Sequence, residues 1–146
     1  MDSLNIPFSQ LSAGAYNQPT MRVDNYTVAP FICFDAAYSN FVADNTKGKS
    51  LIVIVSDDSW FGDTIALQQQ LQMTQKRARE TGRFILVTNN SGITALISPN
   101  GKIYASIKKH KKLTLLSYVR LSHGNTPFMV WGYTLPWIFA CLMLLL

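Results

Sequence analysis

The sequence predicts an α/β fold, in which buried strands pack around at least one helix. Residues 50–56, SLIVIVS, form a β-branched run typical of a strand buried on both faces. Residues 64–81 place apolar side chains at uneven helical spacing, which indicates a helix. Two later apolar runs are separated by the turn Pro99-Asn100-Gly101, so a β-hairpin is expected there. Parallel and antiparallel pairing should therefore occur in one layered domain.

The other expected elements follow in chain order. Residues 1–27 are rich in Ser, Asn, Gln and Pro and predict a loop with a short edge strand. Residues 28–34, VAPFICF, predict a strand. The helix is expected to start at Asp63 as N-cap and to stop at Gly82. Three further strands are expected at residues 83–89, 91–99 and 102–109. Residues 111–120 are a candidate for one more strand.

Composition sets the broad class of the protein. The chain has 146 residues, of which 48% are hydrophobic and 14% charged, so it is too apolar to be disordered and long enough for one domain. Its net charge is +5, and no acidic residue follows Glu80. A basic half can meet nucleic acid or anionic lipid. The KKHKK run at 108–112 lacks interleaved aromatic residues and precedes an apolar segment, which favours anionic lipid over nucleic acid.

The C-terminal segment is uncharged. Residues 127–146, PFMVWGYTLPWIFACLMLLL, are as long as the ~20 apolar residues that cross a ~30 Å hydrocarbon core, so a transmembrane helix is expected. Trp131, Tyr133 and Trp137 suit an interfacial belt. The absence of a polar flank after Leu146 suggests truncation. The alternative is a buried C-terminal helix of a soluble domain. Nearby basic residues would favour a cytoplasmic domain, although that rule weakens for large translocated domains.

The two cysteines are interpreted as independent thiols, because Cys33 lies in an expected strand and Cys141 in the apolar segment. Taken locally, Cys33 is more simply a buried core thiol than a nucleophile. Asp35 would share a face with Cys33 if the strand continued, or would brace the turn if the chain bent there. Local sequence leaves these alternatives open.

The loop at residues 56–63, SDDSWFGD, directly follows the most apolar strand, where α/β folds place ligands. Asp57 and Asp58 could bind a divalent metal, but no further ligands are evident. The simpler interpretation is that one aspartate braces the loop while Trp60 and Phe61 pack.

Four segments together resemble a known family. PFICFDAAYS, LIVIVSDDSWFGD, QMTQKRARETGRF and TNNSGITALISPNGKI occur in the order found in the C-terminal part of apolipoprotein N-acyltransferases, of the nitrilase (carbon-nitrogen hydrolase) superfamily. The resemblance starts near Ile6 and includes the apolar C-terminal segment. It implies an α/β fold with a partial nitrilase-like αββα sandwich over residues 1–125, followed by one truncated C-terminal transmembrane helix over residues 126–146.

The resemblance also implies an activity. A cysteine of a Glu-Lys-Cys triad takes an acyl chain from a phospholipid as a thioester and passes it to the N-terminal amine of a lipoprotein, at the periplasmic face of the bacterial inner membrane. No cofactor and no metal are implied. The residues that carry over are the nucleophile Cys33, the supporting Phe34 and Asp35, and the acyl-binding loop residues Asp58, Trp60, Phe61 and Gly62.

The sequence departs from this family in several ways. The family's catalytic glutamate and lysine belong to segments upstream of the region matched, so the chain by itself is expected to be inactive. Asp35 stands where acyltransferases commonly have glutamate, Asp57 where asparagine is usual and Gln70 where histidine is common. Two alternatives remain: a nitrilase or amidase acting on carbon-nitrogen bonds, and a non-catalytic membrane-tethered binding domain.

Overall fold

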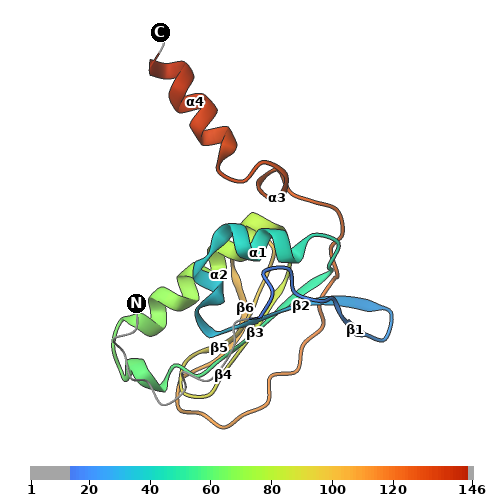
Figure 1. Ribbon diagram of the computed structural model, residues 1–146. Helices are drawn as coiled ribbons and strands as arrows, with labels where there is room; N and C mark the ends of the chain where they lie inside the picture. The colour runs from blue at the N-terminus through green and yellow to red at the C-terminus, as the bar shows by residue number, and fades with distance from the viewer. Residues whose placement is uncertain (1–13, 145–146) are drawn as a thin grey trace.

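The computed structural model describes residues 14–144, so the expectations for residues 1–13 and 145–146 lie outside it. A six-stranded sheet forms the centre of the molecule, with its strands in chain order (Figure 1). The strands are β1 (Met21–Val23), β2 (Tyr26–Ile32), β3 (Leu51–Ser56), β4 (Ile85–Asn89), β5 (Thr94–Ile97) and β6 (Ile103–Ile107). The predicted α/β class is confirmed, as is the short edge strand before residue 28.

The three central strands, β2, β3 and β4, are parallel, whereas the outer pairs are antiparallel. Parallel neighbours need a crossover connection, which helices supply here. A 3₁₀ helix (Cys33–Ala37) and α1 (Ser39–Thr46) join β2 to β3. A second 3₁₀ helix (Ser59–Phe61) and α2 (Ala66–Thr81) join β3 to β4. The carboxyl ends of all three parallel strands therefore meet at one edge.

The core lies between the sheet and the layer formed by α1 and α2, which lie together on one face (Figure 1). Strand β3 shows how the layers divide: Ile52 and Ile54 are fully buried, but Val55 is 53% exposed. The prediction that this strand is buried on both faces is therefore wrong. Among the described residues, helices cover one face of the sheet, and the other face is partly covered by an extended segment that follows β6 (Figure 1). Residues 111–115 of that segment border a groove of about 710 Å³ against β3 and β4.

No strand forms at residues 111–120, which corrects the last strand candidate. Leu116 and Tyr118 are 86% and 93% exposed. The segment contains alternating apolar residues, but a strand also requires a hydrogen-bonded neighbour. Among the described residues the sheet ends at β6, which pairs only with β5.

Helix α2 ends where the sequence predicts and begins later. Gly82 adopts the left-handed conformation with φ 63°, and its N–H donates to the Ala78 carbonyl at 2.9 Å. This is the expected glycine stop. The predicted cap at Asp63 is wrong, because α2 starts at Ala66 with Ile65 at the N-cap position.

The apolar C-terminal segment forms two helices, α3 (Pro127–Trp131) and α4 (Thr134–Leu144), which lead away from the sheet (Figure 1). Thr126 caps α3 by accepting a hydrogen bond from the Met129 N–H at 3.1 Å. Gly132 separates the helices with φ 53° and ψ −131°, values outside the helical region. The predicted continuous helix is therefore wrong. Within residues 14–144, no helix combines the length and apolar character needed to cross a membrane.

Candidate active site

Cys33 follows directly after β2, at the edge where the parallel strands end. Ile32 is paired with Val55 and, one position further along β3, Ser56 is paired with Asn89. This register places Cys33 level with Ser56 and Asn89 across three neighbouring strands. In α/β sheets, ligands bind outside the carboxyl ends of the strands. The site predicted from Cys33 and the loop after β3 thus lies at one edge.

The backbone of Cys33 is strained. Its φ is 51°, in the left-handed region, and the chain turns there directly from strand into 3₁₀ helix. A side chain other than glycine costs about 1–2 kcal/mol in this region, and such strain concentrates at functional sites. The Cys33 side chain is only partly buried. Both observations favour a presented thiol over a packed core residue.

Asp35 braces this turn. Its Oδ2 accepts a hydrogen bond from the Ile32 N–H at 2.8 Å, so the carboxylate ties the end of β2 to the 3₁₀ helix. The alternative in which Asp35 continues the strand beside Cys33 is wrong. Phe34 is 53% exposed and meets Tyr38 edge-to-face, with ring centroids 6.1 Å apart. Ala36 is buried and anchors the turn to the core.

Asp58 centres a buried polar network beneath the edge. Its Oδ1 accepts from the Ser56 hydroxyl at 2.6 Å, and its Oδ2 accepts from the Asn89 side-chain amide. From helix α2, the Gln70 side-chain amide donates a hydrogen bond of 3.1 Å to Ser56 Oγ. Asp58 is 3% exposed and Gln70 is 7% exposed. The network fixes the start of the loop against β3, β4 and α2, so Asp58 is the bracing aspartate.

Gln70 and Asn89 were not predicted as parts of this network. Gln70 lies in the run QQQLQ, which predicts a solvated or hydrogen-bonding helix face; at this position the side chain is buried and hydrogen-bonded. One sequence feature points to Asn89: it stands at the end of the apolar strand β4, which in the sheet lies level with Ser56 at the end of β3.

The rest of the loop is presented outward. Trp60 is 86% exposed, so its predicted packing is wrong, and Phe61 is partly buried. Gly62 ends the 3₁₀ helix with φ 53°, a conformation suited to glycine. Trp60 and Phe34 therefore expose aromatic side chains at the same edge of the sheet as Cys33.

Asp57 serves its own loop. It accepts a hydrogen bond from the Ser59 N–H at 3.0 Å, and this bond lowers the pKa of its carboxyl. Across residues 14–144, no group of three or more His, Cys, Asp or Glu side chains is placed to hold a metal ion. The hydrogen bond between Asp57 and Ser59 lies within the loop itself.

Asp63 joins the loop to the basic run at residues 108–112. Its Oδ1 contacts Lys109 Nζ and lies 3.1 Å from His110 Nε2. His110 itself has φ 60°. The hydrogen bond from Lys109, followed by that from His110, lowers the pKa of Asp63. The contact therefore ties the extended segment after β6 to the loop next to the candidate site.

We predict that Asp63→Asn accelerates backbone amide exchange in residues 108–112. Because folding lowers the pKa of Asp63, its contribution to the stability of this contact is fully present above the pKa of an unfolded aspartate and is lost as the pH falls through the lower, folded pKa. Hydrogen exchange measured at pH 7 should show the difference, and 1 M salt should reduce it. Asp44→Asn, which removes an exposed pair with Lys47, is the control. Equal exchange in Asp63→Asn and the unmodified chain would contradict the prediction.

Sequence comparison relates the chain to characterised proteins. The sequence model of the carbon-nitrogen hydrolase family matches residues 6–123. Apolipoprotein N-acyltransferase from Coxiella burnetii is 45% identical over 133 residues, covering 91% of this chain and 27% of that protein. The Pseudomonas putida enzyme of the same name is 34% identical over 145 residues, covering 99% of this chain and 28% of that protein. The chain thus spans about a quarter of the length of these curated relatives.

Solved structures share the fold at low sequence identity. A CN-hydrolase superfamily protein from Xanthomonas campestris superposes with a TM-score of 0.58 at 15% identity, covering 69% of this chain and 43% of that one. An amidase of the nitrilase superfamily from Nesterenkonia superposes with a TM-score of 0.55 at 15% identity, covering 68% of this chain and 40% of that one. The mixed α/β fold is therefore shared, over less than half of each larger chain.

Proposed function

The chain belongs to the carbon-nitrogen hydrolase family, and from that premise we propose that it is the cysteine-bearing, C-terminal part of an apolipoprotein N-acyltransferase. One observation carries the proposal: in a chain that aligns with such enzymes over nine-tenths of its length, Cys33 occupies a strained turn at the carboxyl edge of the parallel strands. As such a part, the chain contributes the acyl-carrying residue of an enzyme.

The proposed reaction has two steps. The Cys33 thiolate attacks the ester carbonyl of a phospholipid, the ester C–O bond breaks, and the lysophospholipid leaves as an alcohol after taking up a proton. The N-terminal amine of a lipoprotein then attacks the thioester, forming an amide and restoring the thiol. Splitting one acyl transfer into two steps in this way is nucleophilic catalysis.

The surroundings of Cys33 suit an acyl chain. Phe34 and Trp60 offer exposed aromatic surface at the same edge, while Asp35 and Asp58 hold the turn and the loop. In this proposal Phe61 and Gly62 complete the acyl-binding loop. No cofactor takes part in either step.

The proposal assigns the remaining parts as follows. Residues 1–125 belong to the carbon-nitrogen hydrolase domain, at the periplasmic face of a bacterial inner membrane. Residues 126–146 meet that membrane, and α4 supports this because Trp137, Phe139 and Leu144 are exposed. The glutamate and lysine of the triad come from outside this sequence. The chain alone therefore does not complete acyl transfer, since loss of general-base catalysis by itself lowers the reaction rate about 10²–10⁴-fold.

A chimera tests the proposal. The C-terminal quarter of the Coxiella burnetii enzyme is replaced by this chain, and acylation of Cys33 is measured by mass spectrometry after incubation with phospholipid in detergent. We expect a hydroxylamine-sensitive thioester at Cys33 in the chimera and none in this chain alone. A folded chimera in which Cys33 stays unmodified would contradict the proposed acyl transfer. A thioester on the isolated chain would contradict only its inactivity.

A further inference from the structure

The Cys33–Ala37 turn requires support from outside itself. The positive φ of Cys33 is unfavourable, so the turn persists only where its neighbours hold it. Its front is held by the hydrogen bond between Asp35 and the Ile32 N–H. At its rear, the Tyr38 N–H donates to the Asp35 carbonyl oxygen at 3.1 Å, a backbone bond that does not include Ala37. The contacts at Ala37 and Ser39 therefore supply the support that comes from outside the turn.

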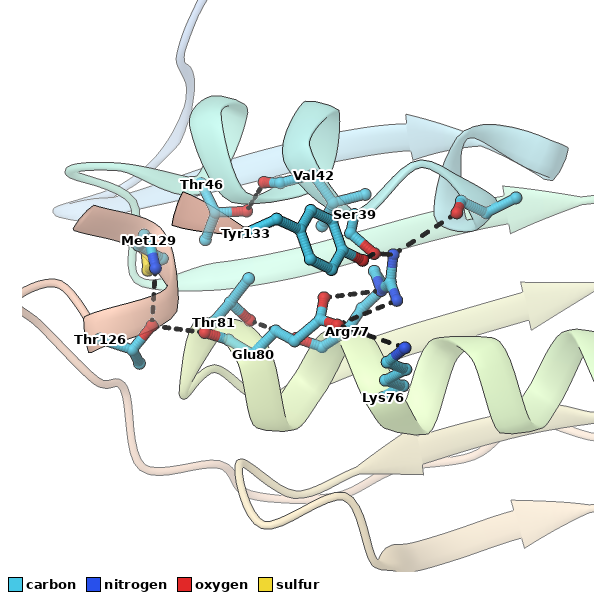
Figure 2. Close-up of polar contacts among 11 residues, drawn as sticks. Ser39, Val42, Thr46, Lys76, Arg77, Glu80, Thr81, Thr126, Met129 and Tyr133 are labelled. Carbon is cyan, nitrogen blue, oxygen red and sulfur yellow. Dashed lines mark hydrogen bonds and ion pairs between the residues drawn. The ribbon is translucent and has the colours of Figure 1, made fainter. Parts of the chain in front are cut away.

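Arg77 of α2 reaches the rear of the turn (Figure 2). Its Nη1 donates to Ser39 Oγ and lies 3.5 Å from the Ala37 carbonyl oxygen, at the outer limit of a hydrogen bond. The other side of the guanidinium pairs with Glu80, with Nε–Oε2 and Nη2–Oε1 distances of 3.0 and 3.1 Å. The Arg77 side chain is 4% exposed, so its position is fixed by these partners.

Tyr133 joins the same cluster from the C-terminal segment, just before α4. Its hydroxyl donates to Ser39 Oγ at 2.9 Å, although the two residues are 94 positions apart in the chain (Figure 2). The Tyr133 ring packs edge-to-face on Phe128, with centroids 5.4 Å apart. Ser39 therefore receives hydrogen bonds both from α2 and from the segment that leads into the apolar helix.

The C-terminal segment is seated on the end of α2 by further contacts. Thr126 donates to the Glu80 carbonyl oxygen, so the residue that pairs with Arg77 also anchors the start of α3 (Figure 2). Arg83 donates to the Gly124 carbonyl oxygen, and Met129 is 2% exposed against the helical layer. Displacement of this segment would consequently change the partners of Arg77 and Ser39 together.

We infer that Arg77 and Tyr133 are positioning residues for Cys33, so that seating the segment before α4 on the helical layer holds the nucleophile turn in its strained conformation. The inference deepens the proposed function and rests on it for the role of Cys33. Neither side chain touches the reacting atoms. Each acts through Ser39 and, for Arg77, the Ala37 carbonyl.

The reactivity of the Cys33 thiol tests this inference without any acyl transfer. The chain in detergent is treated with iodoacetamide, and alkylation of Cys33 is followed by mass spectrometry from pH 6 to 10, with Cys141 in α4 as internal reference. Tyr133→Phe and Arg77→Lys are compared with Tyr118→Phe, a matched loss of a hydroxyl from a residue 93% exposed.

We expect Tyr133→Phe and Arg77→Lys each to slow alkylation of Cys33 about threefold to tenfold relative to Cys141, as the loss of one hydrogen bond allows. The double variant should slow alkylation of Cys33 by less than the product of the two single effects, because both substitutions act on Ser39. Tyr118→Phe should have no effect. If Arg77→Lys does not fold, Tyr133→Phe alone decides the outcome. An unchanged Cys33 rate in folded Tyr133→Phe, even with a lower melting temperature, would reduce the cluster to a structural role and overturn the inference.

Discussion

Cys33→Ala should abolish acyl transfer by the chimera, with a rate at least about 10⁴-fold below that of the Cys33 form. Removal of a covalent nucleophile costs this much or more, because the remaining groups have no acyl carrier to act on. Transfer of a labelled acyl chain from phospholipid to a diacylglyceryl peptide is the measurement. Cys33→Ser is the matched variant: it keeps the size and shape of the side chain but replaces the thiol with a hydroxyl, which is far less nucleophilic near neutral pH.

The stability of a glycine variant, compared with that of Cys33→Ala, checks the strain at this position. Cys33→Gly should melt about 3 °C above Cys33→Ala, since glycine is freed from a penalty of about 1 kcal/mol at φ 51°. Thermal unfolding followed by circular dichroism gives the comparison. A lower melting temperature for the glycine variant would contradict the strained conformation and leave the activity prediction intact.

Asp58→Ala should destabilise the chain by about 3 kcal/mol, or roughly 10 °C in melting temperature. The variant leaves the buried Ser56 hydroxyl and the partly buried Asn89 amide without the carboxylate that accepts from both. A buried polar group that loses its partner costs its full desolvation free energy. Chemical unfolding by urea, monitored by tryptophan fluorescence, provides the free energy of unfolding.

Asp57→Ala is the control for this experiment, because it removes the neighbouring carboxylate from the same loop. Asp57 is exposed and accepts a local hydrogen bond from the Ser59 N–H. Its loss should cost less than about 1 kcal/mol. Equal destabilisation by the two substitutions would show that the buried network contributes nothing beyond loop geometry.

The sequence predicts those elements whose cause is local. Strand β3 is an unbroken β-branched run, the stop of α2 is a glycine in the left-handed region, and the β5–β6 hairpin turns at Pro99-Asn100-Gly101. Helix α1 was not predicted, because SNFVADNT contains few strong helix formers. It forms through tertiary contacts: Val42 is fully buried, and the Asn45 side-chain oxygen accepts from the Gln18 N–H at 2.7 Å.

The sequence predicts where the candidate site lies in the fold but not how its side chains are arranged. A cysteine after one apolar strand and a polar loop after the next indicate one edge of a parallel sheet, which the structure confirms. The conformation of Cys33 and the burial of Gln70 depend on partners from other elements. Ser39, Arg77 and Tyr133 come from three segments far apart in the chain, so no local sequence pattern predicts their contact.

The strand order of the sheet bears on how the chain folds. Each strand pairs with the one directly before it in the chain, so the sheet can grow stepwise from the N-terminal side as synthesis proceeds. The contact between Tyr133 and Ser39 closes a loop of 94 positions and requires nearly the whole chain to have emerged. We therefore expect the Cys33 turn to reach its final conformation among the last folding events, so that a half-made chain would not yet hold the nucleophile in its strained geometry.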